Sequence, residues 1–222
     1  MKDATHIVVL LDRSGSMGSV KDETISGFNY FLKEQKATGD NASLTLVQFD
    51  SESTDVVHEA RPVRDVPDLN GDTYEPRGST PLLDALGETI NSTGRTLAAI
   101  PEPNRPDKVV FVVITDGEEN ASHKFKKTQV KEMIDHQTAK YNWQFVYLGA
   151  NQDAFAEAGA IGIARANAAN YDSVYTDMAY ASTSLNIANY RRTAQPAKLK
   201  YSEKQRADMV EPKPEAEEDE KP

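Results

Sequence analysis

Apolar residues recur along the chain in short runs, which lie between longer segments of helical periodicity. The two clearest runs, 6–11 and 109–114, consist almost wholly of β-branched, aliphatic or aromatic residues. Such runs lack the polar alternation of a half-exposed strand and are typical of strands buried on both faces of a parallel sheet. Further strands are predicted at 44–49 and 144–148, with a more polar edge strand at 54–60 and a short last strand at 161–166.

Between these runs the apolar positions take up a helical spacing. In the segment 20–36, Ile25, Phe28 and Leu32 fall on one face of a predicted helix. Pro81 suits the first turn of the next helix, with Thr80 as its cap. Because strand and helix alternate from end to end, we predict an α/β fold. Its sheet should be doubly wound, open and mostly parallel, with helices on both faces and one antiparallel edge strand.

The C-terminal part of the chain has a different composition. Aliphatic residues become scarce after Ala194, and residues 211–222 hold six acidic residues, two lysines and three prolines. Such a segment buries too little apolar surface to offset the entropy of folding. We therefore predict one domain over residues 1–192 and an acidic, disordered tail over residues 193–222.

Composition excludes several classes of protein. The 222 residues carry a formal net charge of −10 and no cysteine. A disulfide framework, a thiolate zinc site and a cysteine nucleophile are therefore excluded. The acidic balance argues against nucleic acid as a partner. No apolar run approaches the ~20 residues of a membrane span, and the N-terminus lacks the pattern of a signal peptide. A cytoplasmic protein with no membrane partner is expected.

Polar loops follow the buried strands at the edge where open parallel sheets bind ligands. Asp12, Ser14 and Ser16 follow the first strand, Asp116 follows the strongest strand, and Thr80 lies in a loop between them in sequence. Each residue alone has a structural explanation, as a helix cap or a turn former. Together they offer two carboxylates and several hydroxyls, which are hard oxygen donors suited to Mg²⁺, with Mn²⁺ as the alternative.

The motifs Asp12-x-Ser14-Gly15-Ser16, Thr80-Pro-Leu and Thr-Asp116-Gly resemble the metal-ion-dependent adhesion site of von Willebrand factor type A domains. The likeness runs from about residue 6 to residue 148, and the Thr-Pro-Leu form resembles that of bacterial or phage intracellular members. It implies a Mg²⁺ bound directly by Ser14, Ser16 and Thr80. Asp12 and Asp116 would contact the ion directly or through water, and one open position would accept an acidic side chain of a partner.

The resemblance implies a Mg²⁺-dependent protein-binding module that acts as an adaptor or assembly factor. An AAA+ ATPase is a partner type that it suggests, with a Glu or Asp of the partner completing the metal site. Two alternatives stay open: a virion-associated or extracellular adhesive protein, and a metal-dependent hydrolase. We do not expect an enzyme, because the sequence lacks a serine-hydrolase elbow and a nucleotide-binding loop. The acidic tail is a further source of carboxylates for the open position.

A few neighbouring residues carry secondary expectations. Arg13 is expected to face solvent beside the metal. Glu118 and Glu119 are expected either near the metal or at the start of a helix, where the helix dipole favours acidic groups. The alternating aromatic residues after position 142 are expected in the core. Asn151 and Asp153, in the turn after the strand at 144–148, have no assigned role.

Overall fold

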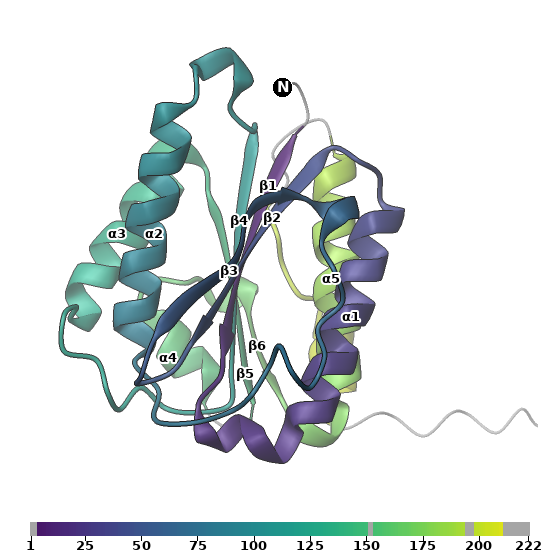
Figure 1. Ribbon diagram of the computed structural model, residues 1–222, viewed down its shortest axis with the longest axis vertical. Helices are drawn as coiled ribbons and strands as arrows, with labels where there is room; N and C mark the ends of the chain where they lie inside the picture. Colours follow the sequence, from purple (N-terminus) through teal and green to yellow (C-terminus); the bar gives the residue numbers. More distant parts are fainter. Residues whose placement is uncertain (1–3, 151–152, 194–197, 211–222) are drawn as a thin grey trace, which may run out of the picture.

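The computed structural model describes residues 4–150, 153–193 and 198–210. A six-stranded sheet runs through the centre of the molecule in the order β3-β2-β1-β4-β5-β6 (Figure 1). Every neighbouring pair of strands is parallel except β2 and β3, which are antiparallel. The predicted α/β class is therefore confirmed, including the antiparallel edge strand. The strands are β1 (Thr5–Asp12), β2 (Ala42–Phe49), β3 (Thr54–Pro62), β4 (Lys108–Thr115), β5 (Gln144–Ala150) and β6 (Ala168–Tyr171).

Helices cover both faces of this sheet, as Figure 1 shows. Helices α1 and α5 pack on one face and helices α2, α3 and α4 on the other. Among the described residues, no helix combines the length and apolar character needed to cross a bilayer. The helices are α1 (Lys21–Ala37), α2 (Leu82–Ala99), α3 (Lys127–Tyr141), α4 (Ala154–Ala160), α5 (Thr176–Arg192) and α6 (Glu203–Asp208).

Both faces of the central strands are buried, and this explains their unbroken apolar sequences. In β1, Ile7 and Val9 face the layer of α1 and α5, whereas Val8 and Leu10 face the layer of α2 and α3. Successive side chains of a strand point to opposite faces, so two cores require apolar residues at every position. The two central strands, β1 and β4, are therefore held rigidly, and the loops at their ends start from fixed positions.

Three aromatic residues on the face of the sheet that α2 and α3 cover form one stacked group. The ring of Phe111 lies 5.3 Å from that of Trp143 and 5.1 Å from that of Phe145. Tyr147, two residues further along β5, is fully buried in the same core. The expectation that these residues lie in the core is confirmed.

The last strand was predicted at the wrong position. Residues 161–166 form no strand, and β6 begins at Ala168. Gly162 takes a φ of +88° directly after α4, so the chain turns there instead of extending. Ile161 and Ile163 are nevertheless buried. Their apolar side chains anchor the turn in the second core, which is why the local composition resembled a strand.

The boundary predicted at residue 192 is also wrong for part of the tail. Residues 198–210 pack against the domain, with Leu199, Tyr201 and Met209 buried. The Tyr201 hydroxyl lies 2.6 Å from that of Thr183, and the amide of Asp172 donates to the carbonyl of Met209 at 3.0 Å. Three spaced apolar residues suffice here, because all three join the core cluster that also contains residues of β5, β6 and α5. Residues 211–222, the most acidic part of the tail, lie outside the described residues.

His6 is a buried titratable group in β1. Its side chain is 4% exposed, Nδ1 lies 2.8 Å from the Ser43 hydroxyl, and Nε2 lies 3.3 Å from the Thr45 hydroxyl. Burial disfavours the charged imidazolium and lowers the pKa of His6 to about 4. An unfolded histidine keeps a pKa of about 6.5. Between these two values the unfolded chain binds a proton that the native protein does not bind.

We therefore expect stability to fall as the pH drops from about 6.5 towards 4, since protons favour the unfolded state in this window. His6→Gln, which stays neutral, should lack this component. From neutral pH to about pH 4.5, the wild type should lose roughly 2–3 kcal/mol more than the variant in the free energy of unfolding. Urea denaturation at the two pH values measures it. Equal losses in both proteins would mean that His6 is not the titrating group.

Candidate metal centre

The first and second predicted loops are joined by backbone hydrogen bonds at the carboxyl edge of the sheet. The amide of Gly15 donates to the carbonyl of Gly78 at 3.0 Å, and the amide of Arg77 donates to the carbonyl of Arg13 at 2.8 Å. A Cβ on Gly15 would lie 3.2 Å from the Gly78 oxygen, and Gly78 has a φ of +66°. Glycine at both positions allows the two loops to approach this closely.

Asp12 lies at the base of the site and is fully buried. Its Oδ1 accepts from the amide of Ser14 at 2.7 Å, and its Oδ2 accepts from the Thr115 hydroxyl at 2.5 Å. The Tyr74 hydroxyl donates to the Asp12 carbonyl at 2.7 Å. The carboxylate is therefore held in one orientation. Thr115 was not predicted as part of the site, although its place beside Asp12 follows once β1 and β4 are known to pair in parallel register.

The hydroxyls of the three loops converge beside this carboxylate. The Ser16 hydroxyl donates to Oδ1 of Asp116 at 2.7 Å and lies 3.2 Å from the Ser14 hydroxyl. A Cβ placed on Gly117 would lie 3.0 Å from Oγ1 of Thr80, 3.4 Å from the Ser16 oxygen and 3.9 Å from the Ser14 oxygen. The structure thus brings all five predicted residues together, and the bare glycine leaves the space between the hydroxyls open.

The site is buried at its base and open at its rim. Asp12, Ser14 and Thr80 are buried, whereas Ser16 is exposed and Asp116 is half-buried. An incoming group would therefore approach over Ser16 and Asp116.

Thr80 is held by the third loop and is not a helix cap. Its amide donates to the Asn120 side chain at 3.0 Å, and the amide of Asn120 donates back to the Thr80 carbonyl at 3.2 Å. The N-cap position of α2 is Pro81, and the side chain of Glu119 satisfies the first turn by accepting from the amide of Leu83 at 2.9 Å. The helix-start interpretation of Glu119 is thus closer to the structure, but the helix is α2, which precedes it in sequence. The Thr80 side chain therefore stays available to the site.

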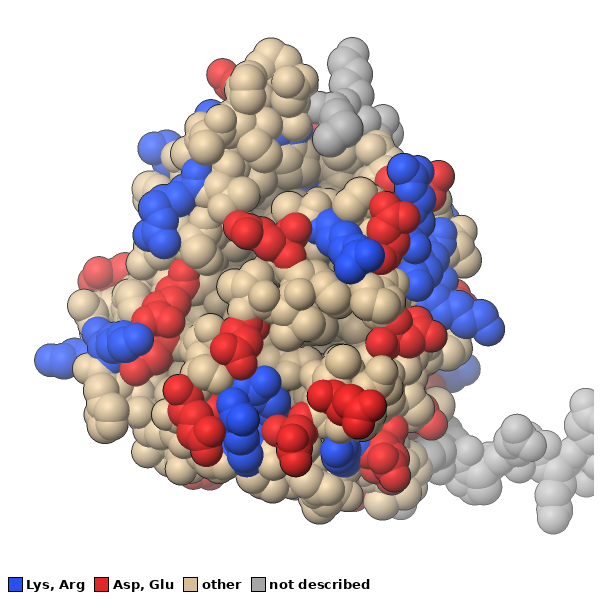
Figure 2. Space-filling view, viewed as in Figure 1, with Lys and Arg blue, Asp and Glu red and all other residues tan. Residues whose placement is uncertain are grey.

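Arg13 was predicted to face solvent, but in the structure it is paired with carboxylates and largely buried. It pairs with Asp50 and with Asp55, each at 2.8 Å, and its side chain is only 11% exposed. The antiparallel turn between β2 and β3 brings these two carboxylates to the first loop, and Arg77 also pairs with Asp50 at 3.0 Å. Figure 2 shows acidic and basic side chains interleaved along the lower end of the molecule, where β1 ends in Figure 1. Arg13 therefore braces the first loop and is not a free cation beside the site.

The electrostatics of the two site carboxylates favour a cation. Burial raises the pKa of Asp12 to about 6, although the hydrogen bonds from Thr115 and Ser14 act in the opposite direction. Burial also raises the pKa of Asp116. Neither carboxylate forms an ion pair with Lys, Arg or His within the described residues. A divalent ion held between the hydroxyls would supply the missing positive charge.

The donor set fits a hard divalent cation. Within the described part of the chain, no group of three or more His, Cys, Asp or Glu side chains is placed to bind a metal. The donors of this site are instead two carboxylates and three neutral hydroxyls, the oxygen chemistry that Mg²⁺ and Mn²⁺ accept. Ser14, Ser16, Thr80, Asp12 and Asp116 are the residues that would hold the ion.

Of the two residues after β5 that had no assigned role, the structure describes only Asp153. Asp153 caps α4, since its Oδ1 accepts from the amide of Ala156 at 3.1 Å. Asn151 lies outside the described residues.

Comparison with known proteins was informative only for the structure, since no protein-family model and no curated protein sequence matches this chain. Proximal thread matrix protein 1 from the mussel byssus aligns with a TM-score of 0.59 at 15% identity, over 81% of this chain and 46% of that protein. The form of that protein with a zinc-occupied MIDAS (metal-ion-dependent adhesion site) motif aligns with a TM-score of 0.56 at 16% identity, over 81% of this chain and 47% of that protein. A von Willebrand factor type A protein from Catenulispora acidiphila gives 0.54 at 14% identity, over 83% and 42%.

Because the sequence identities are only 14–16%, the likeness to these proteins shows a shared fold and nothing finer. The chain spans less than half the length of each of these neighbours. One of them holds zinc in its MIDAS motif, so the fold accommodates a divalent metal. The sheet order, the helices on both faces and these neighbours together show that this protein has a von Willebrand factor type A-like fold, one typical of protein-interaction and adhesion modules.

Proposed function

We propose that this protein is a Mg²⁺-dependent protein-binding module that acts as an adaptor or assembly factor. The observation that carries the proposal is the convergence of three hydroxyls around Gly117, beside two carboxylates that pair with no cation in the described part of the chain. Mn²⁺ is the alternative ion. The proposal places the protein in the bacterial cytoplasm, or in a phage-infected cell, with an AAA+ ATPase as one type of partner.

The donor set explains why the bound ion would recognise a carboxylate. Ser14, Ser16 and Thr80 contribute no formal charge, so Mg²⁺ held by them keeps much of its positive charge. Asp12 has both carboxylate oxygens engaged by Ser14 and Thr115, which limits how far it can neutralise the ion. An Asp or Glu of a partner, arriving over the exposed Ser16, would form a charge-assisted contact in a partly desolvated groove.

The same geometry argues against hydrolysis. A metal-dependent hydrolase needs a base that activates water. Of the four histidines, His6 is buried inside the sheet, His58 lies in β3 and His136 lies in α3. This leaves His123, in the loop after Asp116, as the histidine to test as a base. We therefore propose a binding protein and expect phosphomonoester, phosphodiester and peptide substrates to stay intact with Mg²⁺ or Mn²⁺.

A virion-associated or extracellular adhesive role is the second candidate. The observation that favours it is the structural likeness to a byssus thread matrix protein, which shares the fold. The partner distinguishes the candidates, since an adaptor binds a protein of its own cell, whereas an adhesive protein binds an external surface or a particle component.

Thr115→Val tests whether the Thr115 hydroxyl supports metal binding by holding the Asp12 carboxylate in place. The variant removes the hydroxyl that orients the buried carboxylate, and loss of such a supporting contact lowers metal affinity about 10- to 100-fold. We expect a loss of about tenfold in Mg²⁺ affinity, measured by isothermal titration calorimetry. Thr128→Val, at an exposed position of α3, is the matched control and should bind Mg²⁺ like the wild type. An unchanged affinity in Thr115→Val would contradict the supporting role of this residue.

Ser16→Ala tests the function itself. The variant removes one of the three hydroxyls that would hold the ion. Weaker metal binding should lower partner binding about 10-fold or more, since the partner carboxylate is proposed to bind through the ion. Affinity capture from the native host, with and without EDTA, identifies the partner, and titration of the purified partner gives the affinity. Ser26→Ala, at an exposed position of α1 outside the three loops, is the control and should bind the partner like the wild type. Recovery of the same proteins with EDTA and with Ser16→Ala would exclude recognition through the metal.

A further inference from the structure

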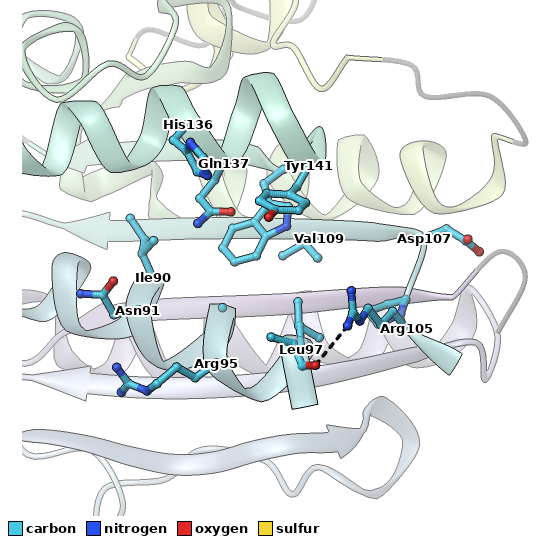
Figure 3. Close-up of a pocket in the computed structure, with 14 residues that line it drawn as sticks. Ile90, Asn91, Arg95, Leu97, Arg105, Asp107, Val109, His136, Gln137 and Tyr141 are labelled. Atoms are coloured by element: carbon cyan, nitrogen blue, oxygen red, sulfur yellow. Dashed lines mark hydrogen bonds between the residues drawn. The ribbon is translucent and has the colours of Figure 1, made fainter. Parts of the chain in front are cut away.

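A pocket of about 420 Å³ lies at the end of the sheet opposite the candidate metal centre. Figure 3 shows it between α2, which carries Asn91 and Arg95, and α3, which carries His136, Gln137 and Tyr141, with Val109 of β4 beneath. Val109 is the second residue of β4 and Asp116 follows its last residue. At ~3.3 Å per residue the two sites are about 20 Å apart. The pocket is within the size range of small-molecule sites.

The floor of this pocket is apolar and partly aromatic. Ile90, Val109 and Trp143 line it and are at most 5% exposed. Trp143 is held by its stacking on Phe111, so this part of the floor is rigid. Tyr141 stands at the rim with half of its surface exposed. An aromatic ring entering the pocket would meet indole and phenol surfaces, which favour stacked or edge-to-face contacts.

The charges around the pocket are mostly positive, although the whole chain is acidic. Arg95 and Arg105 line it against a single carboxylate, Asp107. Arg105 is engaged, because its guanidinium donates to the carbonyls of Ile100 at 2.8 Å and Ala98 at 3.0 Å. These bonds also satisfy the carboxyl end of α2. Arg95 forms no hydrogen bond or ion pair with any other described residue, so its donors remain available to an anion.

Gly94 keeps the pocket open on the α2 side. Glycine weakens a helix interior relative to alanine, and a glycine that stabilises the fold usually allows a close contact. Here a Cβ on Gly94 would meet no atom within 4 Å, although the residue lines the pocket. Packing within the protein therefore gives no reason for glycine at this position. A larger side chain would occupy the space that a ligand could fill.

We infer that this pocket is a binding site for a small aromatic monocarboxylate, whose ring lies on the floor at Trp143 and whose carboxylate pairs with Arg95. Burial of the ligand's ring would supply most of the binding free energy. The carboxylate would make the site selective for acids, because a planar guanidinium binds a carboxylate through two parallel hydrogen bonds. The site does not involve the metal residues, so it stands independently of the proposed Mg²⁺-dependent function.

Trp143 provides the readout, because it is the single tryptophan of the chain. The full-length protein is titrated with three probes while tryptophan fluorescence is recorded. The first, 3-phenylpropionate, has both the ring and the carboxylate; 3-phenylpropan-1-ol has only the ring; propionate has only the carboxylate. We expect a saturable response to 3-phenylpropionate, at least tenfold weaker binding of the alcohol and no response to propionate. The results should be identical with Mg²⁺ and with EDTA.

Two variants locate the site. Gly94→Leu should abolish the response to both aromatic probes while the thermal unfolding temperature stays equal or rises, since the new side chain enters open space. Arg95→Gln should weaken 3-phenylpropionate about tenfold and leave the alcohol unchanged. Arg61→Gln, an exposed arginine of β3, is the control and should behave like the wild type.

Three outcomes would overturn the inference: no saturable response to 3-phenylpropionate, a response that survives in Gly94→Leu, or equal loss of both aromatic probes in Arg95→Gln. Were Gly94→Leu to lose its fold, Gly94→Ala would replace it, with a smaller side chain and an expected partial loss of affinity. Failure of these tests would leave the metal-dependent function untouched, because the probes and variants do not involve the metal site.

Discussion

A buried carboxylate that pairs with no cation among the described residues organises the carboxyl edge of this protein. Asp12 lies at the end of the central strand, bound by a backbone amide and by the Thr115 hydroxyl of the neighbouring strand. Its desolvation is costly, and the hydrogen bonds offset only part of that cost, as its raised pKa indicates. A positive charge from outside the chain would offset this cost, which is why we propose that the surrounding hydroxyls hold a divalent ion.

The loops that surround Asp12 are stabilised by contacts among themselves. Arg13 fastens the first loop to the turn between β2 and β3, and the paired backbone bonds of Gly15 and Gly78 fasten it to the second loop. Asn120 and Glu119 bind the second loop and the start of α2 to the third. Three loops from distant parts of the sequence thus form one rigid rim. A pre-organised rim lets a metal bind without a large ordering cost, which leaves its open side for recognition.

The two ends of the sheet have different chemistry. The carboxyl edge is polar, with hydroxyls and carboxylates around an open point, whereas the amino edge carries an apolar pocket bordered by arginines. The helices that separate these ends contribute to both, since α2 begins beside Thr80 and carries Gly94 and Arg95 towards its other end. The two proposed sites share no residue, so a ligand at one would not block the other.

The sequence by itself determined the fold class and the five residues of the candidate site. Unbroken apolar runs report burial on both faces of a sheet, and the residues after the first and strongest runs must meet at one edge, which places Asp12 and Asp116 together. Thr80 follows no strand, and its place in the set came from the resemblance of the three motifs to a metal-ion-dependent adhesion site. Only the tertiary structure decided that Arg13 is paired, that Thr115 supports Asp12, that residues 198–210 join the domain and that a pocket opens beside Gly94. Each of these depends on groups far apart in sequence that are brought together by strand register and helix packing, and no local pattern records such pairing.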